Sequence, residues 1–191
     1  QQPWQWGMFY MLGSSIQGRQ LGIVGMGQIG AAVARRARAF GMTIAYTKRT
    51  PLDAATHKEL DAKHVELDEL LATSDVVSLH CPYSPETHHF MNATQLAKMK
   101  SSAYLINTAR GPVVDEAALA DALQRNVIAG AGLDVFEKEP VVHEGLLGLD
   151  NAVLIPHLGS ATVETRAAMA DLAATNALAI LGGKTAPNLV S

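Results

Sequence analysis

Three polar residues stand far apart in the sequence, yet their types together could bind a small organic acid and exchange a proton with it. They are Arg110, which follows Asn107-Thr108-Ala109, together with Glu139 and His157. A planar guanidinium binds a carboxylate through two parallel hydrogen bonds. A histidine, whose ordinary pKa is about 6.5, can donate and accept a proton near neutrality. A carboxylate bonded to the other ring nitrogen would fix the tautomer of that histidine.

Each of the three residues also has a plainer interpretation. Arg110 could be a salt-bridge partner at the start of a helix, and Glu139 a surface charge like Glu137. His157 could be a turn histidine whose ring is satisfied locally. The tendency of catalytic groups to gather where strands end favours the chemical interpretation.

A glycine-rich turn lies upstream of these residues, at Gly25-Met26-Gly27-Gln28-Ile29-Gly30. The apolar run 21–24 precedes it and a helical pattern, 28–40, follows. Gly25 permits a tight turn, Gly27 leaves room for a pyrophosphate, and Gly30 lets the helix pack closely on the strand. The first helical residues, Gln28 and Ile29, offer backbone N–H groups to phosphates. The spacing predicts a dinucleotide-binding βαβ unit; a structural turn and a methyltransferase nucleotide site are the alternatives.

The residues that follow the second predicted strand bear on which dinucleotide is bound. An acidic residue about 20 positions beyond the glycine turn would normally bind the ribose 2′-hydroxyl. The strand ends instead in Thr47-Lys48-Arg49, a hydroxyl and two cations suited to a 2′-phosphate. We therefore expect NADP(H), with NAD(H) possible if this segment is only a solvated basic loop.

Short apolar runs that end in turns recur along the chain and predict the strands of a buried sheet. They cover 21–24, 42–46, 75–80, 103–107, 128–133 and 152–155. Helical patterns lie between most of them, at 28–40, 53–74 (with a distinct piece at 67–71), 93–100, 116–125 and 163–181. This alternation predicts an α/β fold, a Rossmann-type doubly wound parallel sheet with helices on both faces. The last helix carries an apolar face of Met169, Leu172, Ala173, Leu178 and Leu181.

In such sheets ligands bind at the carboxyl ends of the strands, so the residues just beyond each predicted strand are the candidates. They include Cys81-Pro82, Thr108-Ala109-Arg110-Gly111, Asp134 and His157. We interpret Cys81 as a small packing residue rather than a nucleophile. The histidines at 57, 88 and 89 are too isolated for metal ligands and are interpreted as solvated loop residues, so we expect no metal site.

Length and composition favour one domain and argue against two classes of partner. The chain has 191 residues, which can bury one sizeable core. A net charge of −3 gives no basic surface for nucleic acid, and no apolar run approaches the about 20 residues of a membrane span. The single cysteine excludes an internal disulfide framework and fits a reducing compartment. We expect a cytoplasmic protein that binds neither nucleic acid nor membrane.

With the glycine turn, Arg110-Gly111, Asp134-Val135-Phe136-Glu137-Lys138-Glu139-Pro140 and Pro156-His157-Leu158-Gly159 in this order, the sequence resembles the D-2-hydroxyacid dehydrogenase family from Ile16 to its end. The branch of glyoxylate/hydroxypyruvate reductases also shows a strand end like Tyr46-Thr47-Lys48-Arg49. The resemblance implies that Arg110 binds substrate, that Glu139, which precedes Pro140, pairs with the histidine, and that His157 is the acid/base. It also implies positions lining the nicotinamide side of the cofactor site: Cys81, Pro82, Thr87, Thr108, Ala109, Arg110, Asp134, His157 and Gly159.

Members of this family begin with a separate substrate-binding domain, which is absent here. We therefore interpret 1–15 as an apolar arm or linker from that missing domain, 16–181 as the dinucleotide-binding domain and 182–191 as a tail. The resemblance implies a full-length reductase of a small 2-oxo acid, whereas this piece should bind cofactor with little turnover because its cleft is open. The apolar arm and the 17% of charged residues favour a homodimer.

Three other functions share part of this pattern. A non-catalytic, NAD(H)-sensing corepressor shares the fold and the three polar residues. A formate dehydrogenase-like enzyme is disfavoured, since that branch carries glutamine at the position of Glu139. A methyltransferase would leave Arg110, Glu139 and His157 unexplained together.

Overall fold

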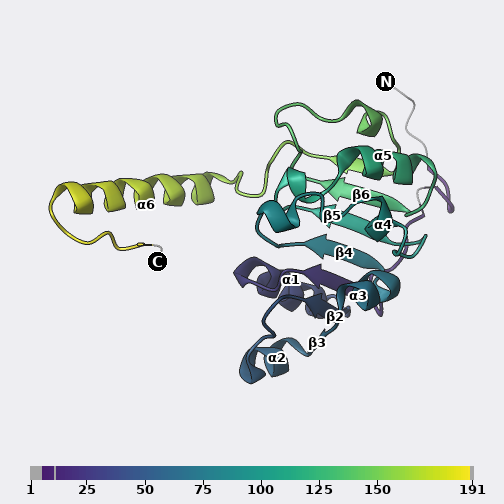
Figure 1. Cartoon of the computed structure of the whole chain (residues 1–191), viewed down its shortest axis with the longest axis horizontal. Coiled ribbons are helices and arrows are strands. Elements are labelled where there is room, and N and C mark those ends of the chain that lie inside the picture. Colours follow the sequence, from purple (N-terminus) through teal and green to yellow (C-terminus); the bar gives the residue numbers. More distant parts are fainter. Residues whose placement is uncertain (1–5, 11, 190–191) are drawn as a thin grey trace.

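A single seven-stranded sheet organises the computed structural model, which describes residues 6–10 and 12–189 (Figure 1). All strands are parallel, in the order β3-β2-β1-β4-β5-β6-β7. Their bounds are β1 (Gln20–Val24), β2 (Thr43–Thr47), β3 (Ala62–His64), β4 (Val76–Leu79), β5 (Tyr104–Asn107), β6 (Gly130–Leu133) and β7 (Ala152–Leu154). The order reverses direction between β1 and β4, which is where doubly wound sheets bind ligands. The predicted fold class is confirmed.

Alternating residues of the strands build two cores, one on each face of the sheet. Leu21 and Ile23 of β1 pack with α1 (Gln28–Ala39) and α2 (Ala54–Leu60). Val24 belongs to the opposite core, which α3 (Leu67–Thr73), α4 (Ala93–Leu96) and α5 (Glu116–Gln124) cover. Because side chains of a strand point alternately to the two faces, an apolar run without alternation is what a doubly covered sheet requires.

The prediction that helices cover both faces holds for only part of the sheet. On the α1 side of β5, β6 and β7, Tyr104 is 47% exposed and Val153 is 65% exposed, whereas Leu105 on the other face is fully buried. Among the described residues no helix lies over this portion, because α1 and α2 follow the early strands and cover only their half of the sheet.

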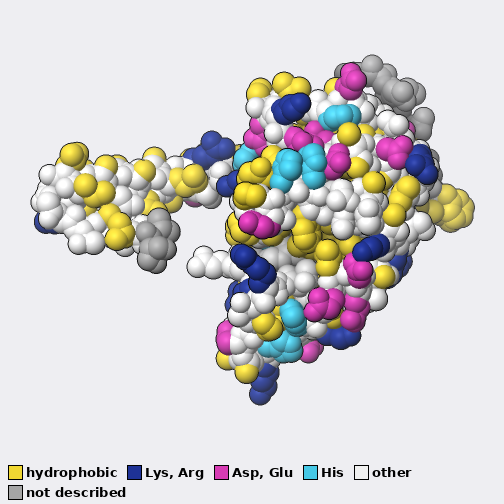
Figure 2. All heavy atoms as spheres, in the orientation of Figure 1, with side chains coloured by type: hydrophobic (Ala, Val, Ile, Leu, Met, Phe, Trp, Pro, Cys, Tyr) yellow, Lys and Arg dark blue, Asp and Glu magenta, His cyan; other side chains and the backbone are white. Residues whose placement is uncertain are grey.

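The last helix, α6 (Val163–Leu181), begins and ends at the predicted residues but does not pack on the described part of the sheet or its other helices. Figure 1 shows it projecting away from the sheet, and Figure 2 shows apolar side chains spread along it. None of its residues is buried, and Met169, Leu172 and Leu178 are all exposed. Within the described ranges, no helix is both long and apolar enough to cross a membrane.

Two predicted elements differ from the structure. The stretch 53–74, predicted as helical, contains the short edge strand β3, which pairs with β2 through Ile44 and Ala62. Three residues with Lys63 in the middle give no apolar run to detect. The helix predicted over 93–100 ends at Leu96, and Lys98 and Met99 continue in tighter turns to Gln95 and Leu96. Of the predicted arm 1–15, residues 1–5 and 11 lie outside the described residues.

Candidate active site

The glycine turn after β1 has two glycines that the fold itself requires. Gly25 has a φ of +92°, and a Cβ placed on it would lie 2.6 Å from the backbone nitrogen of Cys81. A Cβ on Gly30 would lie 2.6 Å from the carbonyl oxygen of Gly25. The turn is therefore pressed against the end of β4 on one side and against its own helix on the other, where any side chain would force them apart.

Gly27 differs from both, because a Cβ there would meet nothing within 4 Å. It is the N-cap of α1, no side chain among the described residues caps this helix start, and the first turn holds no acid. Gln28 and Ile29, the first two residues of the helix, are exposed. Uncapped N–H groups at a helix start attract an anion, and the space at Gly27 admits one. The residues present fit the diphosphate of a dinucleotide.

The segment after β2 is anchored through its backbone. The carbonyl of Thr47 accepts from Gly25 N at 3.0 Å, and the carbonyl of Lys48 lies 3.2 Å from His64 Nε2. Arg49 is exposed and Lys48 is half-buried. Asp53, the first acidic residue after the glycine turn, accepts from Thr56 N at 2.9 Å as the cap of α2. The segment thus offers cations and a hydroxyl, while the first carboxylate that follows it in the sequence caps α2.

The segment after β4 is folded into a tight turn by Thr87. Its hydroxyl donates to the carbonyl of Pro82 at 2.8 Å and accepts from Ser84 N at 2.7 Å, within the 3-10 turn Pro85–Thr87. Cys81 packs against the core, and burial raises the pKa of its thiol. A thiol held protonated is a poor nucleophile, which supports the interpretation of Cys81 as a packing residue.

Arg110 is presented by a turn that the buried Asn107 ties together at the end of β5. Asn107 Oδ1 accepts from Ala109 N at 3.0 Å, and its Nδ2 donates to the carbonyl of Arg110 at 3.0 Å. Thr108 and Arg110 are exposed. The guanidinium donates to the carbonyl of Ala109 at 2.6 Å, a contact within its own turn that leaves other N–H groups available for a ligand.

His157 and Glu139, which are 18 positions apart in the sequence, meet at the ends of β6 and β7. His157 Nδ1 lies 2.9 Å from Glu139 Oε2, and Glu139 Oε1 accepts from Phe136 N at 3.0 Å. The hydrogen bond from His157 and the Phe136 N–H lower the pKa of the Glu139 carboxyl, and the nearby charge of Arg110 acts in the same direction. Glu139 is thus held ionised, and the Nε2 atom of His157 is left for other partners.

Asp134 fixes the turn that carries His157. It is buried, and its carboxylate accepts from Leu158 N and, at 2.8 Å, from Gly159 N, while its carbonyl accepts from His157 N at 3.0 Å. His157 has a φ of +51°, a conformation that costs about 1 kcal/mol or more for a residue with a side chain. Asp134 holds the histidine in that strained conformation, which aims it at Glu139.

A hollow of about 260 Å³ lies beside the Glu139–His157 pair, and its other walls are apolar. They come from Phe136, Pro140, Val142, Leu154, Ile155 and Pro156. An apolar wall excludes water from one side of the two polar groups, which strengthens the hydrogen bond between them.

Sequence reasoning missed three residues behind this pair. Glu137 is not a free surface charge, because its Oε1 accepts from Glu116 N at 2.8 Å and its Oε2 lies 3.0 Å from His89 Nε2. Glu116 is buried although it is a carboxylate at a helix start. His89 is not merely a solvated loop histidine, since it is half-buried, whereas His57 and His88 are exposed. The sequence contained one sign of this network, the two successive acids Asp115 and Glu116. The cap of α5 needs only Asp115, so Glu116 was available for another role.

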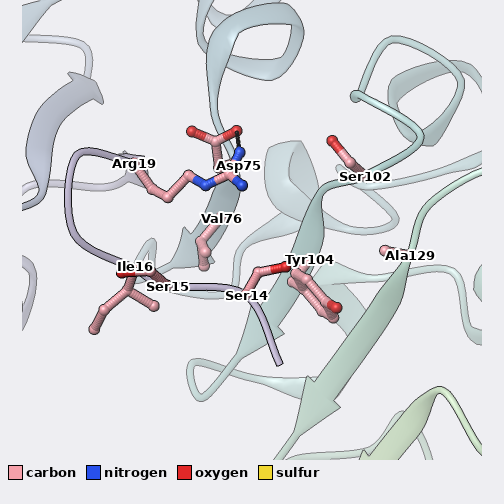
Figure 3. A pocket seen from close by; sticks show the side chains of 9 residues that line it. All are labelled: Ser14, Ser15, Ile16, Arg19, Asp75, Val76, Ser102, Tyr104 and Ala129. Atoms are coloured by element: carbon pink, nitrogen blue, oxygen red, sulfur yellow. Dashed lines mark ion pairs between the residues drawn. The ribbon is translucent and has the colours of Figure 1, made fainter. Parts of the chain in front are cut away.

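A second cavity, of about 190 Å³, lies at the opposite edge of the sheet, where the strands begin (Figure 3). Arg19 and Asp75 line it as an ion pair with 3.5 Å between Nη1 and Oδ1. None of the predicted site residues lies there. In the described part of the chain, no group of three or more His, Cys, Asp or Glu is arranged to hold a metal ion.

Comparison with known proteins places these features in a family. A family model for the D-isomer specific 2-hydroxyacid dehydrogenase, NAD binding domain, matches residues 1–159. The chain is 51% identical over 186 residues to the glyoxylate reductase of Thermococcus onnurineus, which covers 97% of this chain and 55% of that protein.

Two solved structures show the same architecture. The TT0316 protein of Thermus thermophilus superimposes with a TM-score of 0.91 at 48% identity, covering 98% of this chain and 59% of that one. An NADPH-dependent glyoxylate/hydroxypyruvate reductase of Sinorhizobium meliloti superimposes with a TM-score of 0.85 at 43% identity, covering 93% of this chain and 55% of that one. The chain thus spans about half the length of the relatives it matches. A family match that runs through the glycine turn, Arg110, Glu139 and His157 shows that this chain belongs to the D-isomer-specific 2-hydroxyacid dehydrogenase family, as a NAD-binding domain.

Proposed function

We propose that the full-length protein reduces a small 2-oxo acid, such as glyoxylate or hydroxypyruvate, to the D-2-hydroxy acid, with NADPH preferred over NADH. One observation carries this proposal: His157 Nδ1 lies 2.9 Å from Glu139 Oε2 at the sheet edge that also holds Arg110 and the open glycine turn. The glyoxylate reductase relatives support the choice of substrate class.

His157 is the proton donor in this proposal. With Nδ1–H bonded to the Glu139 carboxylate, the charged ring carries its second proton on Nε2 and gives it to the substrate oxygen, and in the reverse reaction the neutral ring takes that proton back at Nε2. Glu139 stays ionised because its pKa is lowered, first by the bond from His157 and then by the Phe136 N–H. It therefore also stabilises the charged ring, which donates the proton in the reduction and is formed again in the reverse reaction.

Arg110 is the substrate-binding cation. Its guanidinium can bind the substrate carboxylate in bidentate fashion and polarise the neighbouring carbonyl. The Asn107 side chain holds the turn, so that little reorganisation is needed when the acid binds.

The cofactor would lie along the strand ends. The helix start at Gly27, Gln28 and Ile29 would hold its diphosphate, and Thr47, Lys48 and Arg49 its ribose phosphate. The family resemblance assigns the nicotinamide end to Cys81, Pro82, Thr87, Thr108, Ala109, Asp134 and Gly159. When bound, the reduced nicotinamide supplies the hydride for the substrate carbonyl carbon.

The NADPH preference is tested by titrating this chain with NADPH and NADH. Arg49→Ala should weaken NADPH by about 10- to 100-fold, the value of one or two charge-assisted bonds, and leave NADH nearly unchanged. Arg125→Ala is the matched control, since among the described residues the exposed Arg125 pairs with Asp121 of α5 alone. Equal losses for both cofactors in Arg49→Ala would refute the assignment.

Turnover is tested by steady-state reduction of glyoxylate and hydroxypyruvate by the full-length protein and by this chain alone. We expect the full-length protein to turn over and the 191-residue chain, which spans about half the length of its relatives, to bind cofactor with little turnover, because a site that does not close over its substrate admits water. Equal rates would overturn the second expectation. A full-length protein that binds NADH but reduces no 2-oxo acid would be a cofactor sensor rather than an enzyme.

We also propose that the full-length protein is a homodimer through this domain, that residues 1–15 link it to the substrate domain and that 182–191 form a tail. The described arm residues Trp6, Met8 and Phe9 are exposed, as are the apolar residues of α6. Sedimentation that gives only monomer at high concentration would refute the dimer.

A further inference from the structure

The loop that carries Glu139 is bound to the start of α5 by two reciprocal carboxylates. Glu116 accepts from Glu137 N at 2.6 Å and from His143 N at 3.3 Å. In return, Glu137 Oε1 accepts from Glu116 N at 2.8 Å. Each glutamate therefore satisfies the backbone N–H of the other, and three backbone groups of two distant segments are fixed by two side chains.

The same loop is pressed against the turn that carries Arg110. A Cβ placed on Gly111 would lie 1.9 Å from the carbonyl carbon of Phe136 and 2.4 Å from the backbone nitrogen of Glu137. No side chain can occupy that position, so the backbone next to Arg110 touches the backbone next to Glu139. A shift of the Glu137 segment would change the separation of the two functional side chains.

A third segment, the loop after β4, joins at Glu137. His89 Nε2 lies 3.0 Å from Glu137 Oε2, and His89 Nδ1 lies 3.9 Å from Asp115 Oδ2. The backbone of His89 donates to the carbonyl of Pro112 at 2.8 Å. The His88 ring stacks on the His89 ring with 4.0 Å between centroids. One carboxylate thus connects the loops that follow β4, β5 and β6.

Burial of the Glu116 carboxylate is not explained by stability alone, because it carries a desolvation cost. Glu116 is 4% exposed, and burial raises the pKa of its carboxyl, an effect that the two bonded N–H groups only partly offset. An apolar residue of similar size would avoid that desolvation cost. Such an apolar residue could not accept hydrogen bonds from two backbone N–H groups, and these bonds are what fix the position of the loop.

We propose that Glu116, Glu137 and His89 are positioning residues, which hold the Glu139 carboxylate at the distance from His157 and Arg110 that the reaction needs. That this position serves a reaction rests on the proposed function, but the positioning of Glu139 can be tested without measuring turnover. The group being positioned, Glu139, has a measurable property, the pKa of its carboxyl, which depends on the His157 contact.

The test is an NMR titration of the Glu139 side-chain carbon in this chain, assigned with Glu139→Gln. In Glu137→Ala we expect the pKa of Glu139 to rise to the ordinary carboxyl value, because the His157 and Phe136 bonds loosen. Removing a negative charge by itself can only lower the pKa of a neighbouring carboxyl. The sign of the shift therefore separates lost positioning from a change of charge.

Three further variants complete the test. Glu137→Gln keeps an oxygen that can accept from Glu116 N, and should retain most of the lowered pKa. His89→Asn, which tolerates the φ of +48° at this position, should raise the pKa in the same direction by less. Glu144→Ala removes an exposed charge outside the network and should cause no rise.

In the full-length protein, Glu137→Ala should reduce kcat by about 10- to 100-fold with little change in NADPH affinity, because small displacements of catalytic groups are that costly. A pKa of Glu139 that stays lowered in folded Glu137→Ala and His89→Asn would overturn the proposal. A full-length wild-type protein without turnover would instead overturn the proposed function, and leave the titration result unaffected.

Discussion

The two edges of the sheet each bring a carboxylate together with basic side chains, but they use them differently. At the edge where the strands begin, Asp75 accepts from Gln20 N at 2.9 Å and from Lys100 at 3.1 Å, and pairs with Arg19 (Figure 3). At the edge where the strands end, the guanidinium of Arg110 contacts only its own turn, through the carbonyl of Ala109, among the described residues. His157 engages one ring nitrogen and is exposed.

The two edges differ in whether their polar side chains still have hydrogen-bonding groups available for a ligand. The carboxylate of Asp75 is satisfied by its own chain and connects β1 to the segment before β5, which is a structural task. The carboxyl edge keeps N–H groups and a ring nitrogen without partners in the described part of the chain, on a backbone that Asn107 and Asp134 hold rigid. Rigid supports with open polar groups are what a binding site needs, whereas the same residue types in a closed cluster only stabilise the fold.

The largest effect that we expect is on kcat, and it should differ between variants at the two edges. In the full-length protein, His157→Gln should lower kcat by about 10²- to 10⁴-fold, the range for loss of a general acid. Asp75→Asn should leave kcat within about twofold, because Asp75 lies at the other edge. Steady-state reduction of glyoxylate measures both. A large loss in Asp75→Asn with a folded protein would contradict the division of tasks.

The glycine turn allows the distinction between residues that stabilise the fold and residues that bind a ligand to be tested with two matched variants, Gly30→Ala and Gly27→Ala. Gly30→Ala should reduce the free energy of unfolding by about 1–3 kcal/mol, since its Cβ would overlap the Gly25 carbonyl. Gly27→Ala should change stability by less than about 1 kcal/mol, yet weaken NADPH binding about tenfold or more, because its Cβ would occupy the space meant for phosphate. Urea unfolding and cofactor titration check the two. Loss of stability in Gly27→Ala without loss of binding would contradict this interpretation.

Asp75→Asn should have its effect on stability, by about 1–2 kcal/mol at neutral pH. Burial raises the pKa of Asp75, but the Gln20 N–H and Lys100 outweigh it, so the pKa is lowered on balance. Its contribution is therefore fully present above the unfolded value of about 3.9 and is lost as pH falls through the folded pKa. In urea unfolding, the difference between wild type and variant should be the same from pH 7 to about pH 5 and should narrow as the pH falls below about 3.9. A difference that does not narrow there would refute the ionic origin.

The smallest expected effect is that of Glu139→Gln on stability. The side chains of Glu139 and His157 are 37% and 51% exposed, and exposed ion pairs contribute little. We expect a change within about 0.5 kcal/mol at pH 7, measured by urea unfolding, although the same variant should lose most activity in the full-length protein. Because the pKa of Glu139 is lowered, any contribution disappears as pH falls through the folded value. A loss as large as that of Asp75→Asn would make this pair structural.

The sequence by itself determined most of the fold and the identity of the candidate site. Uninterrupted apolar runs such as 21–24 are readable because a doubly covered strand must be apolar on both faces. The glycine spacing from 25 to 30 is readable because each position has a separate steric reason. Arg110 and His157 could be selected because each follows a strand, and parallel strands end at one edge of a sheet. Glu139 could be selected over Glu137 because it precedes Pro140, as in the family that the sequence resembles.

Only the tertiary structure decided which neighbours those residues have. Glu137 and Glu139 are both glutamates two positions apart, and although Pro140 distinguishes Glu139 through the family motif, no local pattern shows that Glu137 bonds Glu116 and His89. The uncovered face at Tyr104 and Val153 and the isolation of α6 likewise depend on which segments lie beside them. Local patterns report a residue's own conformational preferences, whereas contacts between segments 20 to 50 positions apart depend on how the whole sheet is assembled.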